Sequence, residues 1–221
     1  MEQLTRDPRF AELTLLVVDF EALTPAGRPA EPIEVAVLAL RPAGGGLVEA
    51  GRSEALIRPP ADVPVTASDV RQTGITAKLL AHAAPAAEVM ACLDAHLTGP
   101  PYRIVAHHAA TEAGLIAHQA AHCPVLAGTR LLDTIRLAKA VLPGLGSYRL
   151  DALLGHYGIP RPVGRHRAMP DVEVTARVLA RLLSDGCVAG RWHTLLGLDA
   201  VAGRPPKRFA APPATEQDAL F

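Results

Sequence analysis

The sequence of 221 residues predicts an α/β protein in which helices flank a mixed β-sheet. Two patterns carry this prediction. Three apolar segments within residues 13–58 are separated by short turns, which is typical of an antiparallel three-strand meander. Further short strands then alternate with segments of helical period, so helices are expected to cover the sheet. Hydrophobic residues make up 49% of the chain, which is enough for one large core.

The predicted strands are short apolar runs bounded by turn residues. Residues 13–18 form such a run, which ends at Asp19 and is typical of a buried central strand. Residues 33–40 begin with a polar–apolar alternation and predict the second strand. After a Pro- and Gly-rich turn at 42–46, residues 47–58 return as the third strand. Later strands are expected at 102–106 and 130–132.

The predicted helices are segments whose apolar residues recur every three or four positions. Over residues 86–97 these are Val89, Met90, Leu93 and Leu97, and a Gly-Pro pair then ends the helix. The other helices are expected at 66–72, 109–121, 134–141, 147–157 and about 170–183.

Composition excludes several classes of protein. Lys+Arg and Asp+Glu both number 22, so the chain lacks the basic excess of proteins that coat nucleic acid through many phosphate contacts. Aromatic residues are 4% of the chain, which argues against a base-stacking platform. Cys92, Cys123 and Cys187 form no CxxC pair, so neither a zinc site nor a disulfide framework is indicated.

Localisation and domain organisation follow from the ends of the chain and from apolar run lengths. No apolar run approaches the length of a membrane span, and the acidic start lacks the features of a signal peptide. We therefore expect a soluble, cytoplasmic protein without a membrane partner. Residues 1–202 are expected to form one domain, and the Pro/Ala-rich residues 203–221 a flexible tail.

Three short motifs carry groups that bind metal or transfer protons. Asp19 and Glu21 point to the same face because side chains alternate along a strand, and two such carboxylates can hold a hard divalent cation. Glu112 lies in the first turn of the helix that follows strand 102–106. His166 precedes a helix whose first turn holds Asp171. Each motif alone also fits a solvated strand end or a helix-capping acid.

The order of these motifs resembles the DEDDh 3′–5′ exonuclease superfamily, in particular its DnaQ-like branch of proofreading exonucleases. Supporting segments are 70–76 (VRQTGIT), 132–134 (LDT) and 147–154 (SYRLDALL). The resemblance spans about residues 13–185, and its most specific part is 166–183 (HRAMPDVEVTARVLARLL). It implies a ribonuclease H-like exonuclease fold and makes residues 1–202 an exonuclease domain.

The resemblance also implies a two-metal mechanism with Mg²⁺ or Mn²⁺ as the two divalent cations. Asp19 would bridge both ions, Glu21 and Asp171 would complete the first, and Glu112 would hold the second. His166 would be the general base on the attacking water, a task suited to an imidazole that titrates near neutrality.

Two departures from the family pattern concern the second metal and the terminal nucleotide. The family usually has Asp where this chain has Glu112, which makes a DEEDh set with one longer ligand. Its first motif often continues as DxETTG, whereas Ala22, Leu23 and Thr24 follow Glu21 here. Predicted substrate contacts are these three residues, His107, and the basic-loop residues Arg165 and Arg167, although ordinary solvated arginines explain that loop equally well.

The last five residues carry a separate signal. Gln217, Leu220 and Phe221 form a Q-x-x-L-F peptide, which resembles the segment that bacterial replication and repair proteins dock on the sliding clamp. The alternative is a C-terminus without a partner.

The leading hypothesis is an exonuclease that acts on DNA 3′ ends in proofreading or repair. An RNA-trimming or oligoribonuclease-like enzyme and a catalytically weak exonuclease-fold binding module are the alternatives.

Overall fold

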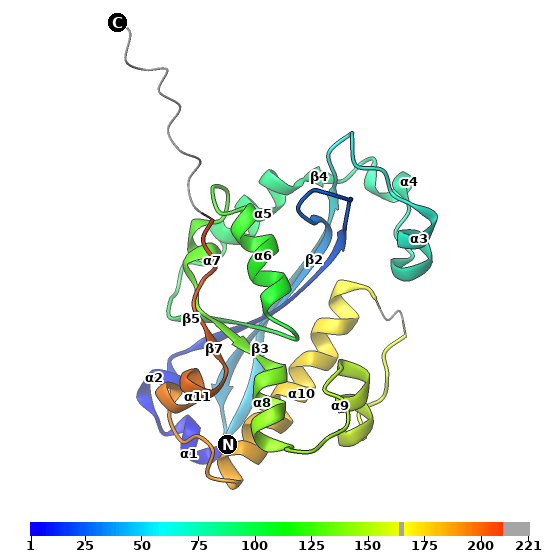
Figure 1. The fold of residues 1–221 in the computed structure, drawn as a ribbon. Coiled ribbons are helices and arrows are strands. Elements are labelled where there is room, and N and C mark those ends of the chain that lie inside the picture. Colours follow the sequence, from blue (N-terminus) through cyan, green and yellow to red (C-terminus); the bar gives the residue numbers. More distant parts are fainter. Residues whose placement is uncertain (164–165, 210–221) are drawn as a thin grey trace, which may run out of the picture.

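A seven-stranded mixed sheet forms the centre of the computed structural model, which describes residues 1–163 and 166–209 (Figure 1). The strand order is β4-β3-β2-β1-β5-β6-β7. The strands are β1 (Thr14–Leu23), β2 (Glu31–Ala43), β3 (Gly46–Arg58), β4 (Ala84–Pro85), β5 (Tyr102–Ala106), β6 (Leu131–Asp133) and β7 (Gly203–Arg204). β1, β2 and β3 form the predicted antiparallel meander, and β5 and β6 run parallel to β1. The predicted α/β class is confirmed.

Helices cover both faces of this sheet (Figure 1). In chain order they are α1 (Glu2–Thr5), α2 (Pro8–Ala11), α3 (Ala67–Thr73), α4 (Ala77–Leu80), α5 (Ala86–Ala95), α6 (Ala110–His118), α7 (Pro124–Gly128), α8 (Thr134–Val141), α9 (Leu150–Tyr157), α10 (Ala168–Val188) and α11 (Leu195–Ala202).

The alternation of side chains along β1 separates two cores. Leu15 and Val17 pack against α8, α9 and α10, whereas Leu16 and Val18 pack on the opposite face with α5, α6 and α7. All four side chains are at most 2% exposed. Burying each large apolar side chain contributes about 1.5–3 kcal/mol, so β1 is the element on which both layers depend.

Three differences from the predicted elements affect the candidate site. β1 continues to Leu23 instead of ending at Asp19, because its outer half pairs with β2 as far as Glu31. α10 begins at Ala168 and ends at Val188, so it is longer than the periodic segment 170–183. Several short helices and the edge strands β4 and β7 carry no periodic signal and were not predicted.

The predicted domain boundary at residue 203 is also corrected. Gly203 and Arg204 form β7, which pairs with Leu132 and Leu131 of β6. Arg204 Nε donates to Asp133 Oδ2 at 3.0 Å. A tertiary ion pair thus extends the folded part past the composition change.

Among the helices of the described residues, none combines the length and the apolar character that crossing a membrane requires.

Candidate active site

The site lies at the edge of the sheet where the parallel strands β1, β5 and β6 have their carboxyl ends. Asp19 and Glu21 follow Leu15 and Val17 on the face of β1 that α10 covers. Asp19 is half-buried and Glu21 is buried. Both carboxylates therefore project between the central strand and the longest helix.

The start of α10 brings a second acid and a histidine to the same place. Asp171 lies in the first turn of α10 and is buried, whereas His166 precedes the helix and is exposed. His166 has φ +63°, a left-handed conformation that is uncommon for a residue with a side chain. This backbone turn directs the chain from the loop into α10.

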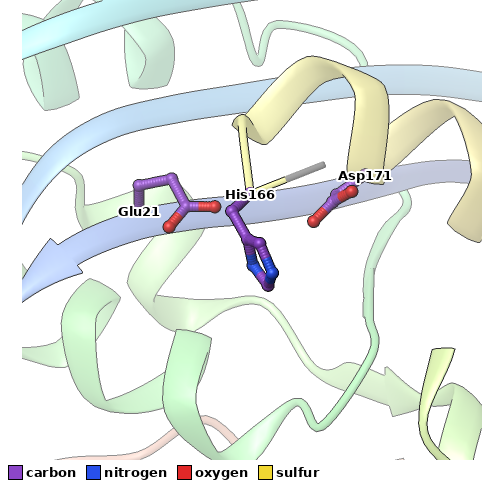
Figure 2. A group of neighbouring side chains, drawn as sticks. All are labelled: Glu21, His166 and Asp171. Atoms are coloured by element: carbon purple, nitrogen blue, oxygen red, sulfur yellow. The ribbon is translucent and has the colours of Figure 1, made fainter. Parts of the chain in front are cut away.

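Figure 2 shows Glu21 and Asp171 on either side of the His166 ring. One ligand atom from each of these three residues lies within 4.8 Å of the others. Carboxylate oxygens are hard donors of the kind that Mg²⁺ and Mn²⁺ prefer. The donor set therefore fits a divalent cation. Within the described ranges, Asp19 and Glu112 are not members of this compact group.

Glu112 lies on α6, at the junction that follows β5. Its side chain is 4% exposed, and Oε2 has no hydrogen-bond partner among the described residues. Burial, with a smaller contribution from the nearby Asp133, raises the pKa of the Glu112 carboxyl to about 8. A buried acid of this kind fits a place where a cation supplies the missing positive charge.

His107, predicted as a substrate contact, is half-buried at the end of β5. Its Nδ1 lies 2.9 Å from Thr134 Oγ1 at the start of α8. Its neighbour His108 has φ +70°, and His108 Nδ1 lies 2.9 Å from Thr111 Oγ1. The His107 ring thus contacts the start of α8, and the His108 ring contacts the first turn of α6.

The other predicted substrate contacts occupy different environments. Ala22 is half-buried, Thr24 is exposed, and Leu23 is buried in a small cluster that includes Ile33 and Ile75. The guanidinium of Arg167 faces Glu34, where its Nη2 lies 2.6 Å from Oε1. Its predicted role as a phosphate contact therefore competes with an internal ion pair. Arg165 lies outside the described residues.

Sequence reasoning missed two buried acids next to the site. Glu34 of β2 is 3% exposed and lies opposite Glu21 in the β1–β2 register. Asp133, 2% exposed, accepts from Ile135 N–H as the N-cap of α8 and pairs with Arg204. A single acid within an apolar strand was the available signal for Glu34. For Asp133 it was an acid directly before a helical segment.

Comparisons with known proteins agree with this geometry. A family model described as "Exonuclease" matches residues 16–179. The DNA polymerase III PolC-type of Thermotoga maritima is 30% identical over 184 residues. These cover 83% of this chain but 13% of that polymerase, so the chain spans about an eighth of its curated relative.

Solved structures show the same fold. The nuclease domain of 3′hExo, a DEDDh family member bound to rAMP, superposes with a TM-score of 0.68 at 20% identity, over 82% of this chain and 96% of that one. E. coli Exonuclease I in complex with a dT13 oligonucleotide has a TM-score of 0.67 at 18% identity, over 80% of this chain and 42% of that one. The predicted ribonuclease H-like exonuclease fold is thereby confirmed.

The family match covers most of the folded part and includes all but the first two residues of β1 and the first turns of α10. It confirms the predicted family, the exonucleases. This chain belongs to the exonuclease family that the matching model describes.

Proposed function

We propose that this protein hydrolyses phosphodiester bonds at DNA 3′ ends, in proofreading or repair. The observation that carries the proposal is the convergence of Glu21, His166 and Asp171 within 4.8 Å, at the sheet edge of an exonuclease fold. Sequence separations of about 150 residues make this convergence a product of the tertiary structure.

Two divalent cations, Mg²⁺ or Mn²⁺, complete the proposed site. Asp19, Glu21 and Asp171 would hold the first, and Asp19 together with Glu112 the second. When bound, such cations lower the pKa of water and stabilise charge on the leaving 3′ oxygen. The buried Oε2 of Glu112 and the clustered donors around His166 support this assignment.

His166 is the proposed general base. Its ring is exposed beside two buried carboxylates, so it can contact both solvent and a bound substrate. An imidazole nitrogen can accept a proton from the attacking water at neutral pH.

DNA is the preferred substrate because the Thermotoga maritima relative is a DNA polymerase. Among the structural neighbours, Exonuclease I is in complex with a dT13 oligonucleotide, whereas 3′hExo is bound to rAMP. RNA trimming is therefore the second candidate. A weakly catalytic binding module is the third, because Glu112 departs from the family pattern. We also propose that the protein acts in the cytoplasm.

The test is degradation of single-stranded DNA and RNA of one sequence by the full chain, with Mg²⁺ or Mn²⁺. Each strand carries a 5′ label in one experiment and a 3′ label in another. The proposal predicts stepwise shortening of the 5′-labelled DNA, early release of the 3′ label, and slower attack on RNA. Faster RNA degradation would favour the RNA-trimming hypothesis. No hydrolysis by the wild type would favour the binding module.

Tethering to the sliding clamp is a separate proposal. Gln217, Leu220 and Phe221 lie outside the described residues, so only their sequence supports it. Deleting residues 217–221 should leave hydrolysis of short oligonucleotides unchanged, because the catalytic groups lie between residues 19 and 171. The deletion should abolish co-elution with a bacterial clamp. A Leu220→Ala/Phe221→Ala variant of the full chain that co-elutes like the wild type would contradict the proposal.

A further inference from the structure

Glu34 is a buried carboxylate next to the site that the proposed mechanism does not use. It lies on β2 directly opposite Glu21 and is 3% exposed. Arg167 Nε donates to both carboxylate oxygens at 3.0 Å, and Arg167 Nη2 donates to Oε1 at 2.6 Å. The backbone N–H of Ala168 donates to Oε2 at 2.8 Å. Both oxygens of Glu34 are therefore occupied by donors of the α10 terminus.

These contacts give α10 a cap that comes from another element. The N-cap residue, Arg167, makes no side-chain cap hydrogen bond of its own. The first N–H groups of a helix need acceptors, and a negative charge is favourable there. Glu34 supplies both, although 134 positions separate it from Ala168. The start of α10 is thus fixed to β2.

The same contacts determine where two site residues lie. His166 directly precedes Arg167 and holds a left-handed φ of +63°. The Asp171 N–H donates to the Arg167 carbonyl at 3.3 Å, so the first turn of α10 starts from Arg167. Glu21, on the other side of the site, is the register partner of Glu34. A displacement of Arg167 would therefore move His166 and Asp171 relative to Glu21.

We infer that Glu34 and Arg167 are positioning residues that hold His166 and Asp171 against Glu21 in the geometry for hydrolysis. This inference rests on the proposed function of those three residues. The planar guanidinium matters more than its charge, because only a fork can donate to both oxygens of one carboxylate in fixed orientation. Arg167 thus acts on a buried carboxylate of the protein instead of binding substrate phosphate.

Two conservative variants test the pair. Arg167→Lys keeps the positive charge but removes the two-pronged contact. Glu34→Gln keeps the size and one acceptor oxygen. Because misplacement of catalytic groups by about 1 Å can cost about 100-fold, we expect kcat to fall about 10- to 100-fold in either variant, with KM changed less than about threefold. The kcat of the double variant should be no lower than that of the less active single variant, because the two residues act as a unit.

Glu173→Gln is the matched control. Glu173 Oε1 lies 2.8 Å from Arg52 Nη1, so this ion pair also joins α10 to the meander, but the side chains of Arg52 and Glu173 are 47% and 40% exposed. In the Glu34–Arg167 pair the arginine is also 39% exposed, but the carboxylate is buried. Loss of the Arg52–Glu173 pair should leave kcat unchanged, since a pair with both members exposed holds geometry weakly. Melting temperatures of all variants show whether they are folded. Wild-type kcat in folded Arg167→Lys and Glu34→Gln would overturn the inference.

Mn²⁺ affinity without substrate separates this inference from the proposed function. Loss of supporting contacts around metal ligands typically weakens binding about 10- to 100-fold, and we expect a loss of about 10-fold in Arg167→Lys and none in Glu173→Gln. If the wild type hydrolyses no nucleic acid, the proposed function fails, but the Mn²⁺ comparison still tests the pair. Equal Mn²⁺ affinity in the wild type and Arg167→Lys would contradict positioning.

Discussion

Replacing Glu112 by Gln should remove a pH-dependent loss of stability from the metal-free protein. Glu112 is 4% exposed, and burial raises the pKa of its carboxyl from 4.5 to about 8. In the unfolded chain the pKa returns to its ordinary value. The folded protein therefore binds this proton more tightly than the unfolded chain, and the free energy of unfolding falls as pH rises from 4.5 towards 8.

The magnitude follows from the two pKa values. Once the carboxyl is ionised in both states, the free energy of unfolding is lower by about 5 kcal/mol, and by about 3 kcal/mol at pH 7. At pH 5 the loss is below about 1 kcal/mol, because the carboxyl is then largely protonated in the folded protein. The glutamine amide of the variant does not titrate. The amide therefore changes the free energy of unfolding by the same amount at every pH.

The assay is urea unfolding of the wild type and Glu112→Gln in a chelator at pH 5, 6, 7 and 8. The difference between the two proteins at each pH isolates Glu112 from the other titrating groups. We expect the variant to gain about 2–4 kcal/mol relative to the wild type between pH 5 and 8. Saturating Mn²⁺ should restore the wild type at pH 8, by about 2.7 kcal/mol at 100 times Kd. A difference that is constant across this pH range would refute the reasoning.

Three further predictions concern the proposed metal ligands and the base. Asp19→Ala or Asp171→Ala should weaken Mn²⁺ binding, measured by calorimetry, and lower hydrolysis by several orders of magnitude; near-normal hydrolysis would exclude these residues as ligands. His166→Ala should bind Mn²⁺ normally but lose about 10²–10⁴-fold in kcat; a wild-type kcat would remove His166 from the role of general base. Glu112→Asp should lower the rate and the metal affinity, because a close-packed site shaped around Glu leaves a shorter ligand out of reach; wild-type values would show that the site accepts either acid.

Local sequence patterns were sufficient for the class of fold and for the strand or helix on which several candidate site residues lie. Strand 102–106 and helix 134–141 were predicted with the bounds that the structure has, because apolar period and turn residues act locally. Asp19 and Glu21 were placed on one face by the alternation of a strand, and Asp171 in the first turn of a helix by the preceding proline. These inferences need only neighbouring residues.

Features that depend on distant residues arise from the packing of the fold. α10 begins at Ala168 because Glu34 accepts its N–H, and no local pattern around residue 168 contains that acceptor. Arg204 extends the fold past the apparent linker because it meets Asp133, 71 positions earlier. Arg167 looks like a phosphate contact in a basic loop, yet its guanidinium faces a buried carboxylate 133 positions away. The local sequence around a charged residue is the same whether its side chain faces solvent or a buried partner. Only the packing of distant elements decides which of these two environments the side chain has.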